Sequence, residues 1–271
     1  MSQDRRRIGV LLSKEIEDLR NSPGLFVPAA ITGLIAILLP FAVAIAIPAL
    51  TGEGLASSSD FRAAAEMFRD QPAARGLSPE GVIQAYLFQR FLILLVLSPV
   101  AGAMAVAAHT VVGEKHARTL EPLLATPLTT FELLAAKVLS ALLPGVALVA
   151  ICFSIYLAGI ALTAAPGVYR TLLTPRALLT VFVFAPLASL AALQLTVCAS
   201  ARVSDARSAQ QIGALIIMPI SALMVAEFAG FVDLGVGTVL EISSALAVLN
   251  AVLMGIAIRL FDRESILTRW K

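Results

Sequence analysis

Six long apolar stretches divide this chain, and they constrain its fold more than any other feature. They cover residues 25–48, 85–112, 138–163, 177–200, 211–231 and 237–258. Each supplies the ~20 apolar residues that an α-helix needs to cross a hydrocarbon layer about 30 Å thick. Because lipid offers the backbone no hydrogen-bond partners, such segments satisfy their own polar groups as helices. The pattern predicts an all-α membrane protein with six transmembrane helices.

The composition supports one membrane domain and leaves no room for a separate soluble one. Hydrophobic residues make up 59% of the chain and charged residues only 14%. We expect a cytoplasmic segment over 1–24, a six-span domain over 25–259 and a cytoplasmic tail over 260–271. Cys152 and Cys198 both lie within spans, so we expect both to be free thiols packed between helices. No metal site, bound cofactor or nucleic-acid partner is expected of this chain.

The distribution of Lys and Arg predicts the orientation. Six spans place both termini on one side, which carries fourteen Lys and Arg residues against six on the other. The positive-inside rule then places both termini in the cytoplasm, for a multi-pass protein of the inner (plasma) membrane.

Before the first span, apolar residues recur at helical spacing opposite a charged face. They are Ile8, Leu11, Leu12, Ile16 and Leu19. We expect an amphipathic helix that lies in the cytoplasmic interface.

The outer connections contain helix-start signals. Asp60 is an expected N-cap in the first, long connection, and Ser78 and Thr174 each precede a proline that suits the first helical position. The last outer connection, near 232–236, is so short that spans five and six should form a tight hairpin. Prolines inside the spans predict kinks. They are Pro40, Pro99, Pro144, Pro186 and Pro219.

The cytoplasmic connection between spans two and three is built more elaborately than a simple linker. Thr119 can cap a short helix with Pro122 in its first turn, and Pro127 ends that helix. Thr129 and Glu132 then form a T-x-x-E capping box for the following helix. Two capped helices around a proline predict a rigid knob on the cytoplasmic side.

This connection carries a family resemblance. Residues 114–127 read E-K-H-A-R-T-L-E-P-L-L-A-T-P. The run is similar to the E-K-x-x-x-T-L-E-x-L-L-x-(S/T)-P signature of ATP-binding-cassette (ABC) permeases of the type-2 export family. Segments 200–211 and 260–267 also resemble that family's second cytoplasmic loop and C-terminus. The resemblance covers nearly the whole chain.

The resemblance implies a permease subunit of an ABC exporter that forms the translocation path. Such permeases pair with a second copy or a similar permease and sit on two cytoplasmic ATPase subunits, which bind ATP and Mg²⁺. The chain itself is not expected to be an enzyme, since it lacks a G-x-x-x-x-G-K-(S/T) phosphate loop. The short capped helix would be the coupling helix, with a second contact after span four. The implied coupling residues are Thr119, Leu120, Glu121, Pro122, Leu123, Leu124, Ser204 and Asp205.

Polar residues within the spans are candidates for the path, because ionisable groups in lipid are costly and often functional. The candidates are Gln194, Glu227 and Glu241. The alternative interpretation places both glutamates at the outer interface, partly hydrated, and leaves Arg90 snorkelling or paired. Small residues over 101–108 predict close helix contacts. We expect spans two and five, including these small residues of span two, to line the surface between two permease copies.

Two other functional classes remain open from sequence. One is a six-span ion channel or secondary carrier without an ATPase, which several buried charges or inverted repeats would favour. The other is an anchoring protein that does not transport. The mostly aliphatic spans favour a hydrophobic or amphipathic substrate for an exporter.

Overall fold

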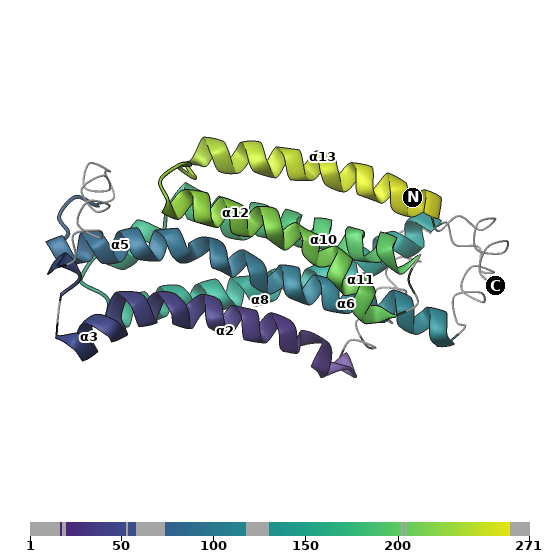
Figure 1. The fold of residues 1–271 in the computed structure, drawn as a ribbon, viewed down its shortest axis with the longest axis horizontal. Helices are drawn as coiled ribbons and strands as arrows, with labels where there is room; N and C mark the ends of the chain where they lie inside the picture. Colours follow the sequence, from purple (N-terminus) through teal and green to yellow (C-terminus); the bar gives the residue numbers. More distant parts are fainter. Residues whose placement is uncertain are drawn as a thin grey trace.

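The computed structural model describes residues 17, 20–52, 54–57, 74–117, 130–201, 203 and 205–260. Within these residues all regular structure is helical. Six helices are long and apolar enough to cross a membrane: Pro23–Thr51, Pro79–His109, Leu134–Thr163, Pro175–Ser200, Ala206–Phe228 and Val236–Leu260. They lie side by side, and the first begins at the end of the bundle where the sixth ends (Figure 1). The predicted all-α fold with six spans is confirmed.

Several spans are composed of consecutive helical segments. Span one contains η1 (Pro23–Phe26), α2 (Val27–Phe41), η2 (Ala42–Ala46) and α3 (Ile47–Thr51); span two contains α5 (Pro79–Phe91), η5 (Leu92–Val96) and α6 (Leu97–Ala117). Span three lies in α8 (Thr130–Thr163), and span four contains α9 (Pro175–Leu179), η7 (Thr180–Phe184) and α10 (Ala185–Ser200). Span five contains α11 (Ala206–Gly213), η8 (Ala214–Ile216) and α12 (Ile217–Phe228), and span six is α13 (Val236–Leu260). Short 3₁₀ helices, η3 (Leu55–Ser57) and η6 (Val168–Leu172), lie between spans. We call the end where α5, α9 and α13 begin the outer end, and the opposite end the cytoplasmic end, after the predicted orientation.

Prolines account for the irregular segments inside the spans. The π-helices η2 and η7 and the 3₁₀ segments η5 and η8 each end two or three residues before a proline. The four prolines are Pro48, Pro99, Pro186 and Pro219. A proline has no N–H for the carbonyl four residues earlier, so the hydrogen-bond ladder changes register there. By contrast, Pro40 and Pro144 lie inside continuous α-helices, and the sequence alone does not separate the two groups.

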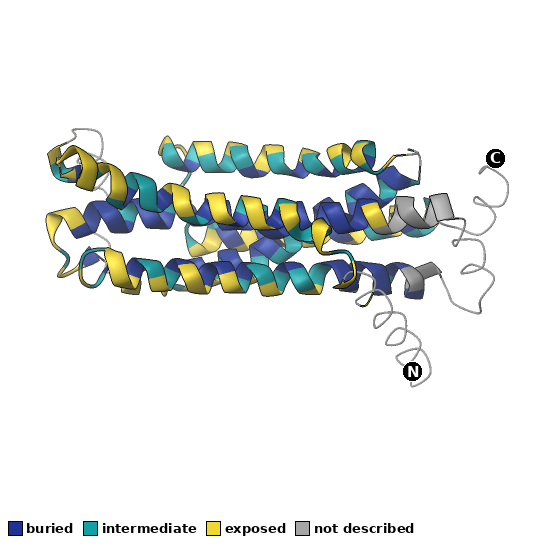
Figure 2. Ribbon diagram, turned by 90° about the horizontal axis from the view of Figure 1, so that it is seen from below, coloured by how far each residue is buried: buried dark blue, intermediate teal, exposed yellow. Residues whose placement is uncertain are grey.

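Span two is the central helix of the bundle. Of the 18 residues in its most apolar stretch, 83% are buried, and α6 packs against α2, α8, α10 and α11. Buried stripes face this centre, while exposed residues run along the outside of the bundle (Figure 2). All residues of 101–108 are buried within one chain. The expectation that they line a surface between two copies is therefore wrong.

The first span approaches span two through small residues. A Cβ on Gly33 would lie 3.0 Å from the Ser98 hydroxyl and 3.1 Å from the Cys152 sulfur, so three spans meet there. The Ser98 hydroxyl also donates a hydrogen bond to the Ala29 carbonyl at 2.9 Å. A Cβ on Gly102 would lie 3.0 Å from the Ala29 methyl. The predicted role of small residues in close helix contact thus applies within the chain.

Three aromatic rings join spans one, two and three. Phe41, Phe88 and Tyr156 pack with ring centroids 5.1 to 5.8 Å apart. The Tyr156 hydroxyl donates to the Phe88 carbonyl at 2.9 Å. That carbonyl is available because the Leu92 N–H bonds to the Gln89 carbonyl, where α5 tightens into η5. The buried phenol is satisfied by a local change in helix type.

The predicted caps of spans two and four are present. The Ser78 hydroxyl accepts from the Gly81 N–H at 3.1 Å, and the Thr174 hydroxyl accepts from the Ala177 N–H at 3.3 Å. In both helices the expected proline occupies the first turn. The expected Asp60 cap lies outside the described residues, as do the interfacial helix, apart from Glu17 and Arg20, and the coupling helix.

The connection between spans five and six is short, as predicted, but α13 packs mainly against α10 of span four, so the expectation of a tight hairpin of spans five and six is wrong. The chain leaves α12 after Phe228, turns through Gly230 at a φ of +76° and enters α13 at Val236. A positive φ is a conformation that glycine adopts without steric cost. No helix lies between these two spans.

Candidate functional site

Spans two, four and five meet near the outer end of the bundle at a buried ion cluster, to which span two contributes a residue from the last turn of α5. One oxygen of Glu227, Oε1, contacts Arg90 Nη1 at 3.1 Å and also accepts a hydrogen bond from Arg176 Nη2. The Glu227 side chain is 0% exposed, and the arginine side chains are 16% and 17% exposed. We call Arg90, Arg176 and Glu227 the outer ion cluster. It carries two positive charges and one negative charge, so one positive charge is in excess.

Aromatic side chains surround the cluster. The Arg90 guanidinium lies 5.1 Å from the ring centre of Tyr86, and Phe91 packs edge-on against Phe228 at 4.9 Å. The contact with Tyr86 stabilises the partly dehydrated guanidinium of Arg90. The second carboxylate oxygen of Glu227, Oε2, accepts no hydrogen bond from any described residue. The cluster therefore depends on the single oxygen that both arginines share.

The sequence indicated only part of this arrangement. Pairing was one of the two interpretations offered for Arg90, and it is confirmed. Partial hydration is wrong for Glu227, whose side chain has no exposed surface, whereas Glu241 on α13 is exposed. The role of Arg176 was missed. Its signal was its position in the first turn of span four, at a depth comparable to that of Glu227 near the end of span five.

The three proposed path residues lie on different helices. Gln194 lies on α10 and is only 3% exposed, and its side-chain oxygen accepts no hydrogen bond from a described residue. Glu227 belongs to the outer ion cluster on α12, and Glu241 lies one turn into α13. An unpartnered buried amide oxygen costs free energy in an apolar interior. Of the three candidates, Gln194 is the buried one on a helix interior whose side-chain oxygen has no protein partner among the described residues.

The cytoplasmic ends of the same three spans also meet. Ala108 of α6, Ala199 of α10 and Ala209 of α11 form a buried contact, which we call the alanine cluster. Small side chains allow the three helices to approach closely. Spans two, four and five are consequently joined at both ends, by charge outside and by close packing inside.

The second cytoplasmic connection is held rigidly against this contact. Asp205 caps α11, and its carboxylate accepts from the Ser208 N–H at 2.7 Å. At the other end of α11, a Cβ on Gly213 would lie 1.9 Å from the Thr196 hydroxyl oxygen, so only glycine fits there. Of the predicted coupling residues Asp205 is described, and Ser204 and residues 119–124 lie outside the described part of the chain.

The described helices show where the first cytoplasmic connection starts and ends. Helix α6 continues to Ala117, beyond the end of span two at His109, and α8 begins at Thr130, before span three. Because α11 packs against both α6 and α10, the two cytoplasmic connections leave the bundle next to each other. A protein bound to one connection would therefore lie close to the other.

Comparison with known proteins identifies the family. The search of curated proteins and the search of solved structures found no match. A family model described as "ABC-2 family transporter protein" matches residues 70–254. That match covers more than half of the chain and includes the outer ion cluster and the alanine cluster. The chain therefore belongs to the ABC-2 transporter family, as a transmembrane permease of an ABC transporter.

Proposed function

We propose that this permease is the membrane subunit of an ATP-driven exporter and is coupled to two separate cytoplasmic ATPase subunits. The observation that carries the proposal is the attachment of spans two, four and five at both ends. Packed helices transmit displacement because a close-packed contact resists compression. A movement imposed on the cytoplasmic connections would thus displace the three spans together, as a rigid body.

The proposed ATPase contact comprises residues 119–124 and the Ser204–Asp205 turn. Two observations support it: α6 and α8 extend past their spans, and the two connections leave the bundle side by side. The capped helix predicted over the first connection carries Leu123 and Leu124, which would fill an apolar groove on the ATPase. The Asp205 cap would keep the second contact in a fixed orientation.

Co-purification tests the contact. With a co-expressed ATPase subunit that the wild-type permease retains, we expect Leu123→Asp and Glu121→Arg to reduce recovery of the ATPase, while the permease stays folded. A charge in the apolar centre of an interface costs about 2 kcal/mol or more, roughly a thirtyfold loss of affinity. Leu173→Asp is the matched control, because Leu173 is a 55% exposed leucine at the outer end. Undiminished recovery with both cytoplasmic variants would exclude this contact.

A second variant separates ATPase binding from transmission. Ala209 is fully buried in the alanine cluster, so Ala209→Leu should push α11 away from α6 and α10. We expect the ATPase still to bind and ATP-driven transport to fall, because an overpacked contact, which costs about 1–3 kcal/mol of stability, no longer holds α11 against both neighbouring helices. Ala247→Leu, at an exposed position of α13, should leave both unchanged. Normal transport by the Ala209 variant would argue against rigid-body transmission.

Gln194 is the proposed path residue that can be tested most cleanly. Replacing an unpartnered buried amide with a hydrocarbon removes a desolvation cost, so Gln194→Leu should match or exceed the wild type in thermal stability. If the amide contacts substrate in the path, transport by the same variant should fall. Wild-type transport by a stable Gln194→Leu protein would remove this residue from the path.

Two permease copies are proposed to line the path together. Span five remains a candidate for the surface between them, because it exposes large apolar side chains. They include Ile212, Leu215, Met218 and Val225. Met218 is 67% exposed, so Met218→Cys should cross-link between copies, whereas Met104→Cys, at a 4% exposed position, should not. Complexes that contain one permease chain per ATPase pair would contradict this arrangement.

The proposed orientation places both termini in the cytoplasm and the Ser57 connection outside. Single cysteines at positions 5, 57 and 271, in a protein with both native cysteines replaced, allow a direct test. An impermeant maleimide added to intact cells should label position 57 only. Labelling of position 271 without position 57 would reverse the orientation.

ATP dependence distinguishes an exporter from the alternative of a channel or carrier. Permease in vesicles with its ATPase should accumulate substrate only when ATP is hydrolysed. Flux at the same rate without ATPase would favour the channel or carrier.

A further inference from the structure

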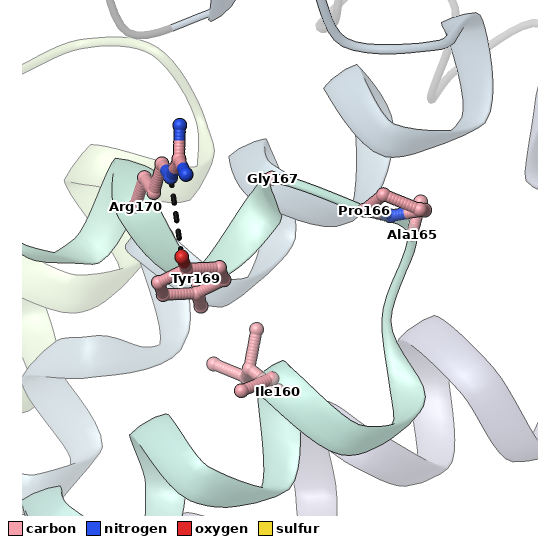
Figure 3. A pocket seen from close by; sticks show the side chains of 7 residues that line it. Ile160, Ala165, Pro166, Gly167, Tyr169 and Arg170 are labelled. Carbon is pink, nitrogen blue, oxygen red and sulfur yellow. Dashed lines mark hydrogen bonds between the residues drawn. The ribbon is translucent and has the colours of Figure 1, made fainter.

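The outer connection between spans three and four encloses a second feature, a pocket of about 430 Å³. Its walls come from the last turns of α8, which include Ile160, and from the segment that runs from Ala165 to Arg170. Figure 3 shows Ile160 below the Tyr169 ring, and Pro166 and Gly167 across the open space from it. A volume of this size suits a small organic ligand or a lipid headgroup.

The segment that forms the wall is held in place by span two. The Gln84 side-chain oxygen accepts from the Ala165 N–H at 2.8 Å, and the Gln89 amide donates to the Thr171 carbonyl at 2.7 Å. Gly167, at a φ of +91°, makes the turn between these two anchors. Both glutamines are 8% exposed, so the bonds are shielded from water. The pocket is therefore formed before any ligand arrives.

One end of the pocket presents hydrogen-bond donors. Arg170 Nε donates to the Tyr169 phenol oxygen at 3.2 Å, and the guanidinium lies 5.7 Å from the Tyr169 ring centre. This bond uses the phenol as an acceptor and leaves its O–H proton for another partner. The guanidinium contacts no carboxylate among the described residues. Its terminal nitrogens and the phenol O–H thus remain to bind an oxyanion.

The other end of the pocket is apolar and lies at the membrane boundary. Ile160, on the side of the Tyr169 ring opposite Arg170, forms the base of the pocket and is only 1% exposed (Figure 3). The apolar surface open to a ligand is that of Ala161, two residues before the end of span three at Thr163, and of Pro166. Two leucines close to the pocket-forming segments in the sequence are also exposed, Leu162 at 84% and Leu173 at 55%. Tyrosine is enriched where a membrane meets water, because its ring is apolar and its hydroxyl is polar. The pocket therefore extends from the level expected for the lipid acyl chains to the level expected for the lipid headgroups.

We propose that this pocket binds a phospholipid of the surrounding membrane, with the phosphate diester on Arg170 and the Tyr169 hydroxyl and an acyl chain along the exposed apolar wall of Ala161 and Pro166. Arginine suits this role, because its planar fork matches two phosphate oxygens. The shared chemistry is a phosphate, and the apolar end favours a lipid over free phosphate. The inference does not depend on coupling to an ATPase.

Binding to the purified full-length permease in detergent, without ATP, tests the proposal. The probes are dihexanoyl phosphatidylglycerol, inorganic phosphate, and dihexanoylglycerol, which lacks the phosphate. We expect phosphatidylglycerol to bind at least about tenfold more tightly than either of the others. Arg170→Gln should weaken phosphatidylglycerol binding at least about tenfold, and Tyr169→Phe about threefold, as expected for a charged and a neutral hydrogen bond.

Arg75→Gln is the control, because Arg75 is an exposed arginine of the same outer end that does not line the pocket. It should change the affinity less than twofold. An equal loss in the Arg75 and Arg170 variants would mean unspecific charge attraction and would overturn the site. Equal affinity for inorganic phosphate and phosphatidylglycerol would overturn the lipid assignment, and unchanged lipid affinity in Arg170→Gln would overturn both.

Discussion

Glu227 offers the sharpest test of how the outer end of this bundle is held together. In Glu227→Gln the side chain keeps its shape but loses its charge, which leaves Arg90 and Arg176 without a shared carboxylate. Removing one partner from a buried ion pair costs about 3–5 kcal/mol. Both arginine side chains retain some exposure, 16% and 17%, so water can solvate part of their charge. We therefore expect the lower end, about 3 kcal/mol.

The assay is thermal unfolding of the purified permease in detergent. A cost of about 3 kcal/mol corresponds to a fall of roughly 6–12 °C in the midpoint for a chain of this size. Glu241→Gln is the matched control, since that glutamate is exposed, and it should change stability by no more than about 0.5 kcal/mol.

A triple variant distinguishes loss of the cluster from loss of one charge. When Glu227→Leu is combined with Arg90→Met and Arg176→Met, no uncompensated charge remains, and most of the lost stability should return. A Glu227→Gln protein that unfolds at the wild-type midpoint would show that the carboxylate does not stabilise the outer end. A triple variant less stable than the single one would refute the desolvation argument.

Two further predictions concern the cytoplasmic end. Gly213→Ala should destabilise by about 1–3 kcal/mol, because its Cβ would lie 1.9 Å from the Thr196 hydroxyl, and Thr196→Ala should restore part of that loss. Gly255→Ala, with nothing within 4 Å of the new Cβ, should instead be neutral or stabilising by up to about 1 kcal/mol in a thermal melt. The Ser208 N–H holds the pKa of Asp205 below its ordinary value of 3.8, so its cap stabilises α11 above that pH and is lost as the pH falls through the lowered value. Hydrogen exchange of 206–213 should therefore show α11 loosening in acid in the wild type but not in Asp205→Asn, and identical acid profiles would contradict the assignment.

Hydropathy and cap chemistry predicted the helices but not their places in the bundle. Six apolar runs were enough for six spans, and Ser78 and Thr174 identified two helix starts, because both signals are local. The central position of span two was not predictable in this way. Lipid and protein interior are equally apolar, so a helix buried by neighbours and one facing acyl chains have the same composition.

The functional residues show the same division. The position of Glu227 near the end of a span was evident from sequence, but its two arginine partners come from spans that are distant in the chain. Their meeting depends on tertiary packing, which charge counting along the sequence does not report. The Asp205 cap, in contrast, involves residues three apart, and such a contact can be read directly from sequence.

The outer ion cluster also has a consequence for biosynthesis. Spans enter the membrane in chain order, so Arg90 and Arg176 arrive with spans two and four before Glu227 has been made. Until span five is inserted, both guanidinium groups lack the carboxylate that pairs with them in the folded protein. Insertion of span five therefore adds a charge partner as well as a helix. Span five supplies the one carboxylate that both arginines share, so we expect a chain truncated after span four to be less stable in the membrane than the full-length chain.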